Sequence, residues 1–439
     1  MHSPSILLFF FITIIIFFIY SLKCEARDSI NVRNPLNGSG DTLVSAGKRF
    51  QLGFFTPEGN NQKNNNRYVG IWYYNSSPRT VVWVANRDKP LSDSCGVFGL
   101  DVDGNLKVWC SNNGTVFPIT SLEKSSTFNR TLQLLDSGNL ILFDGTNRDV
   151  WQSFEVPTDT FLPGMKMKDN IKLTSWIGPS DPGTGNFTFQ ADQGVYTIQN
   201  RSTVHWKSGE PGTLSMYNND LPYVVAQMLS DSDKGLDQKR NGSSNRFIPF
   251  PNYTRVWDYN NSRLLMNSSG HIQYYYFSRG NWSLLWSEPE NRCSVYDACG
   301  KFATCNVKNE RICQCLPGFR PASDGCERES SKICNAHQST DQKDVFLNVS
   351  LMNVVGRATQ FNRAEKEADC KAECLSNCKC EAYSYTGVNT GDRETGNAAA
   401  KCWIWTSDLA NLRQGYADVR LRLSVRVPSS AIGDSFVFH

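Results

Sequence analysis

The chain lacks a strong charge of either sign. Its formal net charge is +3, and only 20% of its 439 residues are Asp, Glu, Lys or Arg. Nucleic-acid binding usually needs a strongly basic domain, so we expect no nucleic-acid partner. The composition also excludes a disordered chain, because 11 Trp, 16 Tyr and 25 Phe can fill hydrophobic cores. The length is enough for several domains of about 100–200 residues each.

The sequence also lacks the motifs of catalysis. None of its five histidines accompanies a nucleophile motif: His2, His205, His271, His337 and His439. It contains no G-x-S-x-G, HExxH or P-loop pattern, and no kinase lysine strand, HRD or DFG motif. A glycosidase needs only a pair of carboxylates, which the sequence does not exclude. We nevertheless expect no enzyme activity, no metal and no cofactor.

Long apolar runs are absent except at the amino terminus. Residues 6–22 read ILLFFFITIIIFFIYSL and are followed by Lys23-Cys24-Glu25-Ala26. Small residues at positions 24 and 26 suit signal peptidase, so we predict a signal peptide over residues 1–26. An uncleaved anchor helix is the alternative. The mature chain is expected to be secreted, in the apoplast or at the cell surface.

The sequence is rich in acceptor sites for N-glycosylation. The pattern Asn-x-Ser/Thr, with no Pro in the middle position, occurs at Asn37, Asn75, Asn113, Asn129, Asn186, Asn200, Asn241, Asn252, Asn260, Asn267, Asn281 and Asn348. Twelve such sites are more than chance would give, which indicates a glycoprotein.

The cysteines fall into three even blocks once Cys24 leaves with the signal peptide. They are a pair (Cys95, Cys110), a first six (Cys293, Cys299, Cys305, Cys313, Cys315, Cys326) and a second six (Cys334, Cys370, Cys374, Cys378, Cys380, Cys402). Each block can close internally as disulfides. Zinc is the competing interpretation, but the C-x-C spacing and the oxidising compartment disfavour it.

The pattern of β-forming residues predicts a mainly β protein. Short runs such as 68–74, 80–85 and 140–143 alternate with Gly, Asn and Asp turns through residues 27–290. The DGNL at 103–106 recurs as SGNL at 137–140, which indicates an internal repeat. Residues 362–377 instead predict one helix, with Asn362 as N-cap and Glu365 completing a capping box.

Several motifs resemble those of the plant S-domain family. They are WVANRD at 83–88, WQSF at 151–154, PTDT at 157–160, LTSW at 173–176, SDPG at 180–183 and WKSG at 206–209. The first cysteine cluster is similar to an EGF-like module, and the second, with CWIWT at 402–406, to a PAN/apple module. The family comprises S-locus glycoproteins and ectodomains of G-type lectin S-receptor-like serine/threonine kinases.

The resemblance implies a domain order. It places a bulb-type lectin domain at 27–150, a second lectin-like S-locus domain at 151–288, an EGF-like module at 289–327, a PAN/apple module at 334–423 and a tail at 424–439. The implied fold is two bulb-lectin-like β-prisms, then the two disulfide-rich modules, the second a sheet with one helix. The transmembrane and kinase parts of the receptor relatives are not in the sequence.

The resemblance also implies a disulfide pairing. In the first six it gives Cys293–Cys305, Cys299–Cys313 and Cys315–Cys326. In the second six it gives Cys370–Cys402 and Cys374–Cys380, which leaves Cys334 for Cys378. We expect Cys95–Cys110 to close a hairpin. Calcium at the EGF-like module is not expected, because residues 288–292 lack the acidic pattern.

The sugar-binding positions of the family are degenerate here. Its mannose sites follow Q-x-D-x-N-x-V-x-Y, and the two segments that correspond are 101–109 and 135–143. Only Asp103 and Asn105 match in the first and Asn139 in the second. Because a site without its Gln and Asp loses hydrogen bonds to sugar hydroxyls, we expect these residues to form turns and not to bind mannose.

Three functions compete. The first is an extracellular recognition module that binds a protein or peptide ligand, with a receptor-like kinase or a second copy of the chain as further partners. The second is a secreted mannose-binding defence lectin, which the degenerate sites disfavour. The third is a truncated product of a receptor kinase gene.

Overall fold

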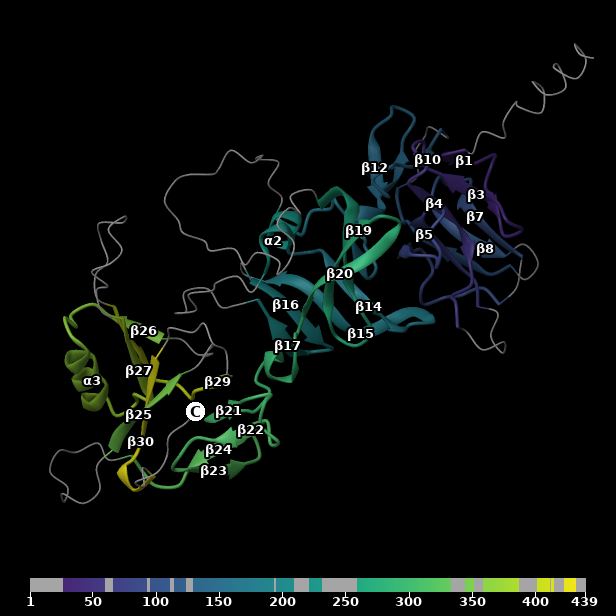
Figure 1. The fold of residues 1–439 in the computed structure, drawn as a ribbon. Coiled ribbons are helices and arrows are strands. Elements are labelled where there is room, and N and C mark those ends of the chain that lie inside the picture. The colour runs from purple at the N-terminus through teal and green to yellow at the C-terminus, as the bar shows by residue number, and fades with distance from the viewer. Residues whose placement is uncertain are drawn as a thin grey trace, which may run out of the picture. The chain divides into compact units, whose positions relative to one another are not determined.

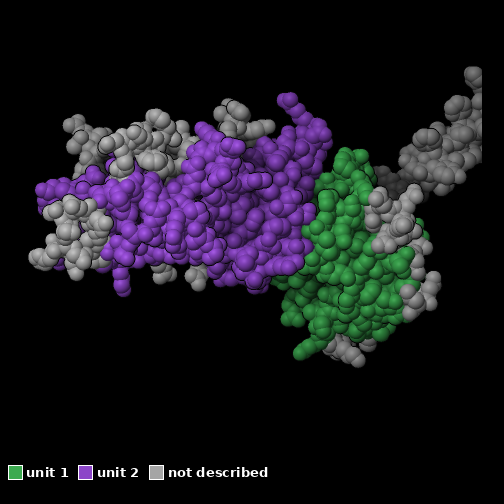
Figure 2. Space-filling view, turned by 90° about the horizontal axis from the view of Figure 1, so that it is seen from below, with its two compact units in different colours: residues 1–165, 176–184 green, residues 166–175, 185–439 purple. Residues whose placement is uncertain are grey.

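The computed structural model describes residues 27–59, 66–92, 95–110, 114–123, 129–192, 195–208, 221–230, 259–332, 344–350, 358–386, 401–410, 412–413 and 422–431. Strands dominate these residues (Figure 1), which confirms the mainly β fold. The predicted signal peptide, Cys334 and residues 432–439 lie outside the described residues. The chain divides into two compact units, residues 1–165 with 176–184 and residues 166–175 with 185–439 (Figure 2).

Three antiparallel sheets of four strands build the first unit. Their orders are β1-β10-β11-β12, β2-β7-β8-β9 and β3-β4-β5-β6. The bounds are β1 Ser29–Asn31, β2 Leu36–Asn37, β3 Thr42–Val44, β4 Phe50–Phe55, β5 Tyr68–Tyr73, β6 Val81–Val84, β7 Gly96–Leu100, β8 Leu106–Cys110, β9 Val116–Pro118, β10 Thr131–Leu134, β11 Leu140–Phe143 and β12 Asp149–Gln152, followed by a 3-10 turn η1 Ser153–Glu155 and β13 Thr160–Phe161. Alternate apolar residues of these strands are buried, as in a sheet with one face on a core.

The next segment forms antiparallel meanders and one short helix. The bounds are β14 Lys172–Gly178, β15 Asp181–Asp192, β16 Val195–Asn200, β17 Thr203–Lys207, α2 Tyr223–Leu229, η3 Tyr259–Asn261, β18 Ser262–Met266, β19 Ile272–Ser278 and β20 Asn281–Glu288. In it β15 pairs with β16, β16 with β17, β18 with β19 and β19 with β20. The sequence did not predict α2, because seven residues are too short for a helical period to stand out. The second β-prism remains a prediction.

The carboxyl-terminal modules contain a small sheet, a hairpin and a larger sheet. The bounds are η4 Arg292–Ser294, β21 Ala303–Cys305, β22 Cys313–Cys315, β23 Phe319–Ala322, β24 Gly325–Arg328, β25 Asp344–Ser350, β26 Ala358–Phe361, α3 Glu367–Ser376, β27 Ala382–Thr386, β28 Lys401–Trp405, β29 Leu412–Arg413, β30 Arg422–Pro428 and η5 Ser429–Ala431. The larger sheet has the order β25-β30-β27-β28-β26, and α3 packs on β27 and β28 (Figure 1).

The single helix of this region begins later than the sequence predicts. It starts at Glu367, and residues 362–366 form turns between β26 and the helix. Asp369 caps it in place of Glu365: its carboxylate accepts hydrogen bonds from the backbone N–H groups of Glu365 (3.1 Å) and Lys366 (3.2 Å). A carboxylate in the first turn also suits the positive end of the helix dipole.

Two boundaries also differ from the sequence-based domain limits. Residues 424–428, assigned there to a tail, lie in β30, the second strand of the larger sheet. The limit at 150/151 falls inside β12, whose Trp151 packs edge-on against Trp83 at 6.2 Å between ring centroids.

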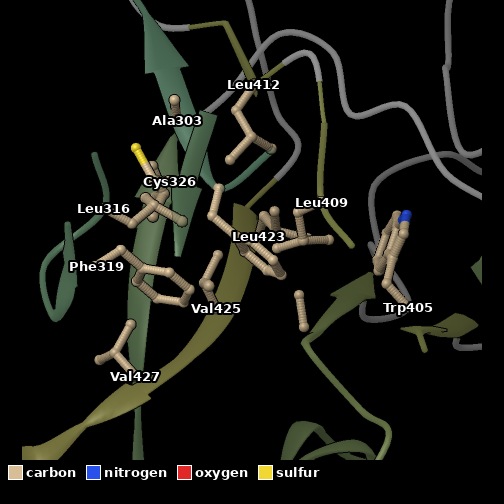
Figure 3. Close-up of a cluster of buried hydrophobic side chains, with 13 residues drawn as sticks. Ala303, Leu316, Phe319, Cys326, Trp405, Leu409, Leu412, Leu423, Val425 and Val427 are labelled. Carbon is tan, nitrogen blue, oxygen red and sulfur yellow. The ribbon is translucent and has the colours of Figure 1, made fainter. Parts of the chain in front are cut away.

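The segments that the sequence motifs assign to the EGF-like and PAN modules share one hydrophobic core. Buried side chains from both enter it: Phe302, Ala303, Leu316, Phe319, Cys326, Val349, Ala382, Trp405, Leu409, Leu412, Leu423, Val425 and Val427. Figure 3 shows Leu316 and Phe319 directed toward Val425 and Val427 of β30. The backbone joins the two as well, because β21 pairs in parallel with β29. Modules too small for a large core of their own thereby complete one together.

A buried ion network joins the same elements. The Asp344 carboxylate accepts hydrogen bonds from Arg426 Nε (2.7 Å) and Arg328 Nη2 (2.5 Å), and the side chains of Arg426 and Asp344 are only 2% and 3% exposed. Arg426 Nη1 also donates to the carbonyl oxygens of Cys374 (3.4 Å) and Asn377 (3.3 Å), at the end of α3. A guanidinium at a helix carboxyl terminus opposes the negative end of the dipole.

Six disulfides are present among the described residues. They are Cys95–Cys110, Cys293–Cys305, Cys299–Cys313, Cys315–Cys326, Cys370–Cys402 and Cys374–Cys380. Cys370 and Cys374 lie on one face of α3 and are fully buried. Cys370–Cys402 therefore fastens the helix to β28, and Cys374–Cys380 closes the turn after it.

We expect loss of the helix-to-sheet disulfide to destabilise the PAN module. The bridge closes a loop of 32 residues, so its removal in the Cys370→Ser, Cys402→Ser variant should cost roughly 2–5 kcal/mol and stop secretion. The Cys374→Ser, Cys380→Ser variant is the matched control: it opens a loop of only 6 residues and should cost less. The measurement is secreted yield and melting temperature. A first variant that melts within a degree or two of wild type would contradict the prediction.

We also expect the EGF-like and PAN segments to unfold together. Leu412 is fully buried in their shared core, so Leu412→Ala should cost about 2–5 kcal/mol. Hydrogen exchange should then quicken to a similar degree in β21–β24 and in β30. Retained protection in β21–β24 beside lost protection in β30 would mean that the two segments are independent.

Candidate functional site

The first candidate sugar site lies at the turn between β7 and β8. The chain reverses over residues 101–105, where Gly104 has a φ of +76° and its N–H donates to the carbonyl of Asp101 (2.8 Å). Asp103 Oδ1 accepts from the backbone N–H of Asn105 (2.8 Å), which closes an Asx turn. The turn alone therefore accounts for the Asp-Gly-Asn sequence, without any ligand.

Lys107 occupies the fourth position of this site, where the family motif has Val. Its Nζ lies 2.5 Å from Asp101 Oδ2 and 2.8 Å from Asp103 Oδ2. These hydrogen bonds lower the pKa of both carboxyls and raise the pKa of Lys107. Because the groups are partly exposed, the ion pairs add little stability. The ion pairs do occupy the Asp103 carboxylate, so a sugar hydroxyl would have to displace the Lys107 ammonium group to bond to it.

Asn105 is buried, and its amide is committed to the protein. Its Oδ1 accepts from Leu122 N (2.7 Å) and Thr120 Oγ1 (3.0 Å), and its Nδ2 donates to Leu122 O (3.2 Å). Thr120 Oγ1 in turn accepts from the backbone of Leu106 (2.9 Å). The side chain thus fastens the segment after β9 to the start of β8.

Asn139 repeats this arrangement at the turn between β10 and β11. Its Oδ1 accepts from Ser153 Oγ and from Phe154 N, both at 3.2 Å, and its Nδ2 donates to Gln152 Oε1 (2.8 Å). Ser153 Oγ accepts from the backbone of Leu140 (2.9 Å), as Thr120 does from Leu106. The repeat of DGNL and SGNL is therefore structural, and it places the two candidate sites on separate sheets.

The WVANRD motif is likewise used within the protein. Asn86 Oδ1 accepts from Val69 N (2.8 Å), and Trp83 Nε1 donates to the carbonyl of Val156 (3.0 Å). Arg87 donates to the carbonyls of Pro182 (2.9 Å) and Gly183 (3.2 Å).

Asp88 completes this set of contacts. Its carboxylate accepts from Thr184 N (2.7 Å) and Thr184 Oγ1 (2.8 Å). WVANRD is therefore bonded to the SDPG motif through Arg87, and to Thr184, the residue that directly follows SDPG, through Asp88.

The structure places most of the predicted glycosylation sites at the surface. Seven are exposed: Asn37, Asn75, Asn129, Asn186, Asn260, Asn281 and Asn348. Asn200 and Asn267 are half-buried, and Asn113, Asn241 and Asn252 lie outside the described residues. Exposure at these positions is compatible with attached glycans.

Within the described residues, three sulfurs lie close enough to hold a metal. Those of Cys299, Cys305 and Cys313 are within 4.8 Å of one another, but each belongs to a disulfide and is not a thiolate ligand. In this same part of the chain, no helix combines the length and apolarity that a membrane span requires.

Three family profiles match the sequence. They are the D-mannose binding lectin profile at residues 80–177, the S-locus glycoprotein domain at 235–323 and the PAN-like domain at 334–412. None of the three describes a catalytic domain. They follow the domain order that the sequence motifs implied.

A solved structure also matches part of the chain. It is a monomeric mannose-binding lectin from Gastrodia elata, 17% identical, covering 29% of this chain and 96% of the other, with a TM-score of 0.22. A TM-score this low supports no conclusion about the fold or the ligand of this chain.

Relatives of known identity match nearly the whole chain. A G-type lectin S-receptor-like serine/threonine-protein kinase of Arabidopsis thaliana is 44% identical over 90% of this chain and 46% of its own length. The chain thus spans about half the length of such kinase relatives. The S-locus-specific glycoprotein S6 of Brassica oleracea is 30% identical over 94% of this chain and 95% of its own. Nearly end-to-end similarity confirms the resemblance: the chain belongs to the plant S-domain family of S-locus glycoproteins and G-type lectin S-receptor-like kinase ectodomains.

Proposed function

We propose that the chain is a secreted or cell-surface recognition module that binds a protein or peptide ligand in plant cell-surface signalling. A receptor-like kinase, or a second copy of the chain, would be its signalling partner. The proposal rests first on family membership, since the matched relatives are receptor kinases and an S-locus glycoprotein. It assigns this chain a binding role and no catalytic step.

The observation that carries the proposal is the use of the sugar-binding residues inside the protein. Lys107 pairs with Asp101 and Asp103, and the amides of Asn105 and Asn139 bond to neighbouring backbone and side chains. A mannose hydroxyl at these positions would have to replace existing hydrogen bonds, for little net gain. These contacts disfavour mannose, and family membership supports a protein or peptide ligand instead.

The disulfides support the proposed location outside the cell. Six are present in the described residues, and disulfides of this density persist in oxidising compartments. The predicted signal peptide would deliver the chain there. We place the domains as the sequence motifs suggest, with Arg422–Pro428 added to the PAN module because β30 is part of its sheet.

We predict no mannose binding by the wild-type chain. Calorimetry with mannose should give no saturable heat at millimolar sugar, whereas the variant Asp101→Gln, Lys107→Val, Trp109→Tyr, which restores the family motif around Asp103 and Asn105, should bind weakly. Wild-type binding at submillimolar affinity, abolished by Asn105→Ala, would contradict the prediction and favour the lectin function.

We predict that the labelled chain binds plant cells through a protein. Binding of the secreted chain to plant protoplasts should be saturable, should be competed by unlabelled chain, and should be lost after protease treatment of the cells. Methyl mannoside should not compete, and the restored-motif variant provides the control for a sugar-dependent signal. Binding that resists protease but yields to mannoside would overturn the proposed function.

A further inference from the structure

An open hollow of about 510 Å³ lies on the meander β18–β20, apart from the degenerate sugar sites. Its lining combines apolar and polar groups: Leu284 and Trp286 with Asn267, Gln273, Ser287 and Glu290. Leu284 is 48% exposed and supplies apolar surface to the lining. The hollow thus offers an apolar floor with hydrogen-bonding groups around it.

A β-bulge creates this hollow. In the pairing of β19 with β20, Gln273 is opposite Ser287 and Tyr274 opposite Trp286, but Tyr275 is opposite Leu284, so the register shifts past Leu285. A bulge bends its strand and leaves the extra residue outside the regular ladder. Because of this shift Leu284, Leu285 and Trp286 all contribute to the lining.

Asn267 stands at the edge of the hollow with its amide held in one orientation. Its Oδ1 accepts from the backbone N–H groups of Ser269 (3.0 Å) and His271 (2.9 Å), inside the turn between β18 and β19. Since the oxygen faces the turn, the amide nitrogen faces the other way. This nitrogen is the atom that N-glycosylation modifies, and Asn267-Ser268-Ser269 is an acceptor sequence.

We propose that Asn267 carries an N-linked glycan whose first N-acetylglucosamine rests in this hollow. The sugar is bonded directly to the amide nitrogen, so its ring lies within one side-chain length of Asn267. The apolar face of a pyranose matches Leu284, and its hydroxyls and acetamide match Gln273, Ser287 and Glu290. Tyr275 donates to Gln273 Oε1 (3.1 Å), which leaves the amide nitrogen of Gln273 on the opposite side.

The occupant is the chain's own glycan because the attachment point is part of the lining. Because the sugar is covalently attached beside the hollow, its effective concentration there is high. Weak contacts are therefore enough to hold it. The hollow is also shallow, which suits a tethered ring better than a dissociable ligand. The inference rests on the secretory route in the proposed function, because only that route adds N-glycans.

The test removes the glycan without disturbing the turn. Ser269→Ala destroys the acceptor sequence but keeps the backbone N–H that bonds Asn267, while Ser269→Thr keeps both. In a host that adds high-mannose glycans, glycopeptide mass spectrometry should find Asn267 occupied in wild type and in Ser269→Thr. Ser269→Ala should melt about 2–4 °C lower, the size expected for one modest contact in a unit of this size. Ser39→Ala, which removes the exposed site at Asn37, should leave the melting temperature unchanged.

Two further measurements locate the effect in the hollow. Trimming with endoglycosidase H leaves a single N-acetylglucosamine, so the trimmed wild type should keep its advantage over Ser269→Ala. In a Leu284→Ala background, that advantage should shrink by half or more, because the sugar loses its apolar contact. Persistence of the full advantage in Leu284→Ala, or its loss on trimming, would overturn the proposal.

Glycan occupancy separates this inference from the proposed function. Glycans at other acceptor sites but none at Asn267 would overturn the inference alone. No glycan at any of the twelve sites would overturn both it and the secreted location.

Discussion

The carboxylate of Asp344 between two guanidinium groups is the interaction on which the carboxyl-terminal half of the chain depends. It compensates the charge of Arg426, whose side chain is only 2% exposed and would be costly to bury without a partner. Arg328, at the end of the EGF-like hairpin, bonds the other carboxylate oxygen. One buried acid therefore links β24, β25 and β30, and through Arg426 the end of α3. The shared hydrophobic core uses the same strand, since Val425 and Val427 flank Arg426 in β30.

The sequence predicted the β-rich fold and its turns well, because both depend on local chemistry. Gly104 and Gly138 adopt φ values of +76° and +85°, which glycine alone adopts without strain, so turns were readable from DGN and SGN. The burial of Arg426 could not be predicted in this way. An arginine in an alternating strand is usually exposed, and this one is buried because of its distant partner Asp344. The start of α3 was missed as well, since the sequence analysis took Glu365 for the capping carboxylate and in the structure it is Asp369.

The internal contacts of the candidate sugar site were only partly predictable from the sequence. Missing Gln and Asp residues indicated weak binding, and that much was visible in the motif. The role of Lys107 was not, because its ammonium reaches two carboxylates only when β7 and β8 pair and their turn closes. Thr120 and Ser153 were missed too. Each fixes an asparagine from a segment more than ten residues away, and no local pattern marks such a partner.

The residues that identify the family therefore say little about what this chain binds. WVANRD, WQSF and SDPG bond to one another or to neighbouring backbone, so their presence keeps the first unit folded. A ligand has to be recognised by side chains outside these motifs, which are free to differ without loss of the fold. Glycans limit that choice further, because each occupied acceptor site covers part of the surface. The recognition surface is therefore to be sought on exposed strands and loops that carry neither a family motif nor a glycan.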